Sequence, residues 1–255
     1  FLNNVGLHHA ALKNNLEIVD FLLPGLEFGI NLFKGCKKLT QITIPTSLKK
    51  IGFSAFEDCI SLTNIIIPPS VTEIGSCAFK GCRSMKEISI PYSISQIGSS
   101  AFENCSSVSQ ISLPSSLIEI ESSMFAYCSL LSTISIPTSV TKIGPSAFEG
   151  CSSLRKVIIP LGVTQIETAV FKNCRSLIMV SIPSSVVEVK SFAFDGCSSL
   201  LEISFPSSVI QIYNHAFKNC SSLQRIIILA EKIRNETNAF DGLSSLSLIS
   251  TPNLK

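Results

Sequence analysis

Apolar residues return along the chain with one fixed spacing. Phenylalanine occupies every twenty-third position, without insertion or deletion, at Phe33, Phe56, Phe79, Phe102, Phe125, Phe148, Phe171, Phe194, Phe217 and Phe240. Cysteines from Cys36 to Cys220 and prolines from Pro45 to Pro206 keep the same interval. A period of this length is typical of a solenoid, in which stacked coils share a hydrophobic core that no single coil could sustain.

The pattern inside one unit predicts a strand followed by a return path. Ile65 and Ile67 alternate with outward positions, which is the period of a strand with one buried face. Pro68 ends this strand because proline has no N–H for the ladder. Val71 and Ile74 are expected to turn inward on the return path, and the Ala-Phe pair that follows is expected to form one buried helical turn.

The residue before each repeating cysteine predicts a special backbone conformation. With Gly242, which precedes Leu243 at the equivalent place, there are ten such positions, and Gly or Asn stands at eight of them. They are Gly35, Asp58, Gly81, Asn104, Tyr127, Gly150, Asn173, Gly196, Asn219 and Gly242. Both residue types tolerate a positive φ. We expect a left-handed residue here that directs the chain into the next strand.

Charges follow the phenylalanines in an alternating order. The residue after each Phe is Lys34, Glu57, Lys80, Glu103, Ala126, Glu149, Lys172, Asp195, Lys218 and Asp241. Stacked coils would bring these side chains side by side, and opposite charges would gain about 0.2 to 1 kcal/mol per neighbour at an exposed site. The pattern predicts a solvated outer edge with favourable register.

Composition narrows the possible functions. Hydrophobic residues make up 45% of the chain and charged residues 15%, and the 20 basic and 18 acidic residues are mixed along its length. This mixture argues against a nucleic-acid partner, which would require basic residues on one face. Apolar runs are far shorter than the roughly 20 residues of a membrane-spanning helix. No secretory leader is recognisable, and secretion stays open.

The unit C-S-S-L-x-x-I-x-I-P-x-S-V-x-x-I-G-x-x-A-F-x-G/N resembles the BspA-like class of leucine-rich repeats. The resemblance covers about residues 32–251. It implies a right-handed, arched, β-dominated solenoid with a parallel sheet on its concave face. This class occurs in surface proteins of bacteria and protozoa, so the resemblance also implies adhesion and no catalytic residues.

Residues 5–23 depart from the repeat and are similar to part of an ankyrin unit. Their sequence, VGLHHAALKNNLEIVDFLL, echoes the ankyrin pattern T-P-L-H-x-A-A…E-I-V-x-x-L-L, although Gly6 replaces the usual proline. The alternative is an unrelated short α-helical cap that covers the end of the core. We therefore expect a helical unit over residues 1–31 and a solenoid over residues 32–255.

Candidate chemistry is sparse. The nine repeating cysteines are expected to be buried free thiols, because parallel Cβ vectors suit disulfides poorly and a column of thiols does not converge on a metal ion. Cys77 lies outside the repeat and is expected to be a surface thiol. His8, His9 and His215 have no partner that the sequence can indicate. We predict no catalytic residue, no metal and no cofactor, and hence no enzyme.

Asn104, Asn219 and Asn235 each begin an N-x-S/T sequon. At Asn104 and Asn219 the repeat itself accounts for both the Asn and the Ser. Asn235 is the better candidate for glycosylation if the chain is secreted.

Binding specificity in a solenoid resides where exposed strand residues differ between coils. The candidate partner-binding residues on the concave face are Gln41, Thr43, Asn64, Ile66, Glu87, Ser89, Gln110, Ser112, Thr133, Ser135, Lys156, Ile158, Met179, Ser181, Glu202, Ser204, Arg225 and Ile227. Hydroxyl groups dominate this surface. It suits a broad contact with a protein or glycan better than a deep small-molecule pocket.

Two functions remain open at this point. The first is an adhesive or protein-binding module that is displayed at a cell surface or secreted. The second is an intracellular scaffold with ankyrin and leucine-rich repeats and a cytoplasmic location, which the many thiols favour. A strand-like stretch at residues 246–251 predicts an unpaired edge, possible end-to-end self-association, and a longer natural protein.

Overall fold

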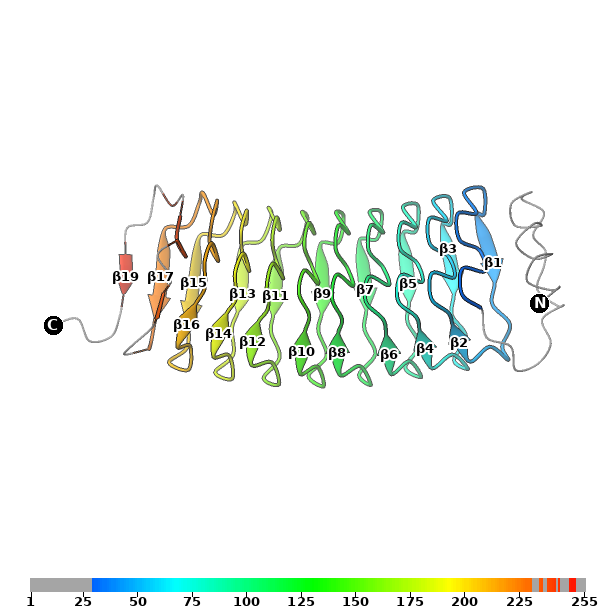
Figure 1. Ribbon diagram of the computed structural model, residues 1–255, viewed down its shortest axis with the longest axis horizontal. Helices are drawn as coiled ribbons and strands as arrows, with labels where there is room; N and C mark the ends of the chain where they lie inside the picture. The colour runs from blue at the N-terminus through cyan, green and yellow to red at the C-terminus, as the bar shows by residue number, and fades with distance from the viewer. Residues whose placement is uncertain (1–28, 231–233, 236–237, 242, 244–247, 251–255) are drawn as a thin grey trace.

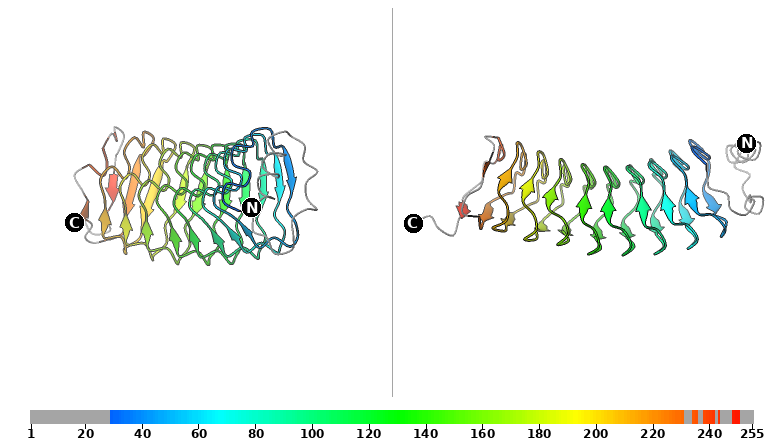
Figure 2. Two further views of the ribbon diagram at one scale, coloured as in Figure 1. Left: turned by 45° about the vertical axis from the view of Figure 1, so that its right-hand side comes forward. Right: turned by 60° about the horizontal axis from the view of Figure 1, so that its bottom comes forward.

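The computed structural model describes residues 29–230, 234–235, 238–241, 243 and 248–250. Within these residues the chain winds into a stack of coils that are built from strands and turns, without a helix (Figure 1). The stack bends gently along its length (Figure 2). Residues 5–23, where an ankyrin-like unit or a helical cap was expected, lie outside the described residues.

Each coil contributes one longer and one shorter strand. The long strands are β1 (Gln41–Thr43), β3 (Asn64–Ile66), β5 (Glu87–Ser89), β7 (Gln110–Ser112), β9 (Thr133–Ser135), β11 (Lys156–Ile158), β13 (Met179–Ser181), β15 (Glu202–Phe205), β17 (Arg225–Ile228) and β19 (Leu248–Ser250). The short strands are β2 (Lys50–Ile51), β4 (Glu73–Ile74), β6 (Gln96–Ile97), β8 (Glu119–Ile120), β10 (Lys142–Ile143), β12 (Gln165–Ile166), β14 (Glu188–Val189), β16 (Gln211–Ile212) and β18 (Arg234–Asn235).

All strand pairs are parallel, and each residue pairs with its equivalent one repeat later, as Gln41 does with Asn64. The long strands form two sheets, β1-β3-β5-β7-β9-β11-β13 and β15-β17-β19, with an interruption between β13 and β15. We call this side the long-strand face. The short strands form three separate sheets, β2-β4-β6, β8-β10 and β12-β14-β16-β18, on what we call the short-strand face. The predicted parallel solenoid is confirmed, whereas the interruptions were not foreseen.

The repeating phenylalanines form a continuous stack inside the solenoid. Ring centroids of successive coils lie 5.1 to 5.8 Å apart from Phe33 to Phe240, and the planes are nearly parallel. The rings from Phe33 to Phe217 are fully buried. Each ring therefore depends on its neighbours for burial, which is worth about 1.5 to 3 kcal/mol per large apolar side chain.

The prediction of a helical turn around the Ala-Phe pair is wrong. Instead, alternate amides point to the next coil: Ser54 N–H donates to Ser76 O (3.0 Å), and Phe56 N–H donates to Ala78 O (2.7 Å). The intervening Ala55 N–H bonds locally to Gly52 O (3.3 Å). A helix would use every amide within its own segment, whereas this turn uses half of them to join neighbouring coils.

Positive φ angles occur at two places in each turn. The position before the repeating cysteine is left-handed as predicted, with φ of 58° at Asp58 and 75° at Gly81. A second left-handed position, four residues earlier, was missed. Its members are Asn31, Ser54, Cys77, Ser100, Ser123, Ser146, Ala169, Phe192 and His215. Serine predominates there instead of Gly or Asn, so residue type alone did not reveal the conformation.

The nine repeating cysteines are free and buried, as expected, and Cys77 is partly exposed. Their thiols form a ladder, because each Sγ from Cys59 to Cys220 donates to the carbonyl of the Phe of the preceding coil. Cys59 Sγ lies 3.1 Å from Phe33 O, and Cys128 Sγ lies 3.1 Å from Phe102 O. Burial raises the pKa of these thiols, that of Cys128 to about 12.

The alternating charges pair between coils, as predicted. Lys34 lies 2.9 Å from Glu57, and Lys80 lies 3.0 Å from Glu103. A third and longer pair joins Glu149 and Lys172, at 3.9 Å, nearer the middle of the stack. These pairs are partly exposed, so they support register and add little stability.

Candidate binding surfaces

The long-strand face brings the predicted partner-binding residues together in two adjacent rows. In each strand the central residue points into the core and its two neighbours point outward, as the pattern in β3 and β5 shows. Of the eighteen predicted residues, Glu202 and Ile227 are half-buried and the others are exposed. The rows are therefore exposed to solvent, and their role in binding a partner stays a prediction. Their position on the concave side of the arc stays a prediction.

The character of this face changes along the stack. From β1 to β9 its outward residues are polar except Ile66. Over β11, β13 and β15 it carries Ile158, Ile178, Met179 and Leu201, whose exposed fractions are 59%, 45%, 48% and 52%. We call these four residues the apolar patch. Large apolar side chains grouped on a surface commonly mark an interaction site.

Ile178 and Leu201 were missed in the sequence because they immediately precede their strands. Equivalent positions in the earlier coils carry Thr40, Thr63, Lys86, Ser109, Ser132 and Arg155. The signal is thus a change from polar to apolar residues between neighbouring coils. A motif averaged over all coils hides this change.

Charged side chains border the apolar patch. Arg225 donates to the carboxylate of Glu202 in the neighbouring coil, so these two charges largely satisfy one another. Lys156, which lies opposite Met179 in the register, forms no ion pair within the described part of the chain. Lys156 is therefore available to a partner, as is the adjacent exposed Arg155.

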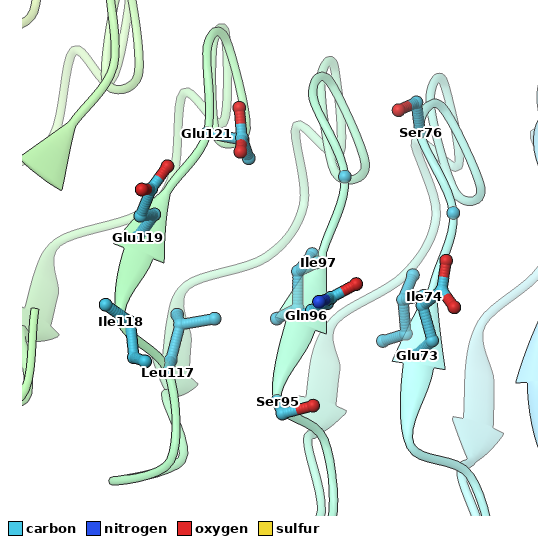
Figure 3. A pocket seen from close by; sticks show the side chains of 12 residues that line it. Glu73, Ile74, Ser76, Ser95, Gln96, Ile97, Leu117, Ile118, Glu119 and Glu121 are labelled. Atoms are coloured by element: carbon cyan, nitrogen blue, oxygen red, sulfur yellow. The ribbon is translucent and has the colours of Figure 1, made fainter.

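The short-strand face carries two shallow grooves. The first, of about 490 Å³, crosses β4, β6 and β8 and is lined by residues that include Glu73, Ser76, Gln96, Glu119 and Glu121 (Figure 3). The second, of about 400 Å³, lies between β10 and β12 next to Glu167. Lys50 lies 2.7 Å from Glu73 and Lys142 lies 3.6 Å from Glu119, so much of the negative charge is already compensated.

A polar cluster lies further along the same face. Lys190 Nζ is 2.5 Å from Glu188 Oε2, Tyr213 Oη donates to Glu188 Oε1 at 3.2 Å, and the ammonium sits 4.5 Å from the tyrosine ring centroid. The hydrogen bond from Lys190 holds the pKa of Glu188 below its ordinary range. The pairings tie two neighbouring coils together, and we assign them a structural role.

His215 is the one histidine among the described residues. It stacks on Phe192 with a centroid separation of 5.1 Å, and its Nδ1 lies 3.6 Å from Asp241. The described residues contain no group of three His, Cys, Asp or Glu side chains placed to hold a metal ion. In the same part of the chain, no helix is long and apolar enough to cross a membrane.

Parallel coils with a repeating L-x-x-I-x-I segment define a leucine-rich-repeat solenoid. The chain belongs to the BspA type leucine rich repeat family, whose model of six copies matches residues 26–155 and 122–247. No curated protein sequence matches the chain.

Among solved structures, the chain is similar to a leucine rich cell surface protein from Faecalibacterium prausnitzii, with 27% identity and a TM-score of 0.57. That match covers 87% of this chain and 66% of the bacterial protein, so the chain spans about two thirds of its relative. It also resembles the T. pallidum leucine rich repeat protein, with 29% identity, a TM-score of 0.50, and coverage of 73% and 75% of the two chains.

Proposed function

We propose that the chain is a binding module that uses the long-strand face to hold a protein partner. The family assignment and the solenoid support a protein-binding role, because stacked coils create one extended, variable surface. A glycan is the second candidate ligand, since hydroxyl groups line the first half of the face. We propose no catalytic function for this chain.

The apolar patch is the observation that carries the proposal. Four large apolar side chains stand about half exposed on a face whose other outward residues are mostly small and polar. Burying such a group against a partner contributes about 25 cal/mol for each Å² of apolar surface. Energetically dominant contacts usually cluster in this way at the centre of an interface.

The test compares captured partners between matched variants of the intact chain. Ile178→Asp with Met179→Asp should abolish capture of the proteins that the wild-type chain retains, whereas Gln110→Asp with Ser112→Asp, on the polar part of the face, should retain them. Circular dichroism melts should agree among the three proteins. Equal capture by the first variant would place the interface elsewhere.

Charge reversal provides a second test. Lys156→Glu and Arg225→Glu, made singly and together, should weaken binding at the border of the patch without unfolding the chain. Lys156 should contribute more than Arg225, because Arg225 already pairs with Glu202. Unchanged affinity in both single variants would exclude this border from the interface.

We further propose that the module is displayed at a cell surface. Support comes from the relative in F. prausnitzii, which is described as a cell surface protein. The free thiols favour the alternative, an intracellular scaffold, because the extracellular environment is oxidising and favours disulfides. Antibody labelling of intact cells supports display, whereas labelling that requires permeabilised cells supports the scaffold.

End-to-end association through the edge at β19 is a further prediction. An edge strand offers unpaired backbone groups that a second chain could extend. Sedimentation velocity over a range of concentrations tests it, and a single monomeric species throughout would exclude it.

A further inference from the structure

One column of residues on the short-strand face determines how closely the coils nest. The column runs Gly52, Gly75, Gly98, Glu121, Gly144, Glu167, Lys190 and Tyr213, one residue after each short strand. A Cβ atom added to Gly75 would lie 2.7 Å from Phe53 N, and one added to Gly98 would lie 2.4 Å from Ser76 N. Glycine therefore permits the backbones of adjacent coils to approach here.

The backbone hydrogen bonds that join successive short strands are lost where glutamate follows glycine in this column. Gly98 N–H donates to Ile74 O at 2.8 Å and Gly144 N–H donates to Ile120 O at 2.7 Å. The equivalent bonds from Glu121 to Ile97 and from Glu167 to Ile143 are absent, although all four residues are described. These two steps coincide with the interruptions between β6 and β8 and between β10 and β12.

Side chains at this column do not by themselves break the ladder. Lys190 N–H donates to Ile166 O at 2.8 Å, and Tyr213 N–H donates to Val189 O at 2.9 Å. Each of these residues follows a coil that already carries a Cβ at the same position, so the two coils can run along matching paths. The mismatch arises only when a residue with a side chain is stacked on a glycine.

The other sides of the solenoid stay joined over three strand residues at the first step and over one at the second, where β9 and β11 pair only between Thr133 and Lys156. Opposite the first interruption, β5 and β7 pair over all three residues. Phe102 N–H still donates to Met124 O (3.0 Å), and the rings of Phe102 and Phe125 remain stacked at 5.8 Å. The groove of about 490 Å³ lies at the first interrupted step (Figure 3). The groove of about 400 Å³ lies at the second.

We propose that the two glycine-to-glutamate steps, Gly98 to Glu121 and Gly144 to Glu167, are the flexible joints of this solenoid. At each joint the short-strand face opens and closes while the long-strand face acts as the hinge. Two coils that are hydrogen-bonded on one face and not on the other move apart most easily on the face without hydrogen bonds. Such bending changes the curvature of the face that carries the apolar patch, so the long-strand face can adapt to partners of different shape.

The proposal makes different predictions for two substitutions of Glu121, each measured by hydrogen–deuterium exchange of the intact chain. Glu121→Gly should restore the ladder bond and slow exchange of the amide at residue 121 about tenfold, the equivalent of one added hydrogen bond of roughly 1.4 kcal/mol. Glu121→Gln removes the charge but keeps the Cβ, so exchange should stay fast. Equal slowing by both variants would overturn the steric explanation.

Glu167→Gly should not remove the second joint but move it by one coil. The new glycine would nest on Gly144, and Lys190 would then follow a glycine. Exchange at residue 167 should slow, and exchange at Lys190 should accelerate by a similar factor. Slowing at residue 167 without acceleration at Lys190 would contradict the rule that the step itself breaks the ladder.

Motion at the joints is measured by electron spin-label distances in a Cys77→Ser background. Labels at Thr72→Cys and Ile210→Cys span both joints on the short-strand face, six coil spacings or roughly 29 Å apart. Labels at Thr63→Cys and Leu201→Cys span the same coils beside the long strands. Glu121→Gly should narrow the first distribution and leave the second unchanged. An equally broad first distribution in that variant would overturn the joint.

Discussion

Raising the pH should unfold this protein through its cysteine ladder. Cys128 is fully buried, and its thiol donates to Phe102 O at 3.1 Å in the preceding coil. Burial raises the pKa of this thiol from its ordinary value of 9.0 to about 12, and a backbone hydrogen bond offsets only part of that rise. Burial also holds the pKa of Cys105 and Cys151 well above the ordinary value.

The direction of the effect follows from proton binding. Between about pH 9 and pH 12 an unfolded thiol has lost its proton, whereas the folded thiol of Cys128 retains it. Folding is therefore coupled to proton uptake, and the stability that the protonated thiol provides is complete below pH 9 and is lost as the pH rises towards 12. One thiol contributes a loss of about 1.4 kcal/mol per pH unit in this window, and several equivalent thiols add to it.

The assay is urea denaturation followed by circular dichroism, at intervals from pH 8 to pH 10.5 with a reducing agent present. Cys128→Ala should lower stability at every pH because it leaves a small cavity. It should also reduce the slope of unfolding free energy against pH by about 1.4 kcal/mol per unit above pH 9. Cys77→Ala is the matched control and should change the slope less, because Cys77 is only partly buried.

The slope, not the absolute stability, decides the outcome. Identical slopes for the wild-type chain and Cys128→Ala would mean that this thiol ionises in the folded protein as readily as in the unfolded one. The burial argument for the ladder would then be wrong.

Three further predictions concern packing, thiol reactivity and backbone strain. Phe125→Ala should cost about 3 to 5 kcal/mol in guanidinium denaturation, because the ring is fully buried between two others; a loss below 1 kcal/mol would contradict the shared core. Iodoacetamide should add one label per native chain, at Cys77, and ten after denaturation, as read by mass spectrometry; rapid native labelling of several thiols would refute the burial of the ladder. Ala169→Gly should raise stability by up to about 1 kcal/mol, because Ala169 has a φ of 56°; a lower melting temperature would show that Ala169 is not strained.

Much of the fold could be predicted because the repeat expresses local rules many times over. The uninterrupted spacing of phenylalanines predicts their column, and the alternation around Ile65 predicts which strand residues are buried. Gly or Asn before the repeating cysteine predicts the left-handed residue there. Each of these inferences depends on one residue type at one position.

The turn and the apolar patch were beyond such reasoning. Ser54 takes a positive φ within a turn whose alternate amides bond to the next coil, an arrangement that belongs to the stack and not to serine itself. Ile178 and Leu201 become parts of one surface only because the register places equivalent positions of successive coils beside each other. Both features depend on contacts between residues that are distant in the sequence.

The sequence by itself determined the solenoid, its period, its core and the outward rows of its long strands. Only the tertiary structure decided where the short-strand sheet is interrupted. Glu121 and Gly98 are unremarkable as single residues, and the ladder fails because one must stack on the other. The physical reason is that burial follows from each residue's own chemistry, whereas nesting depends on the fit between two neighbouring backbones.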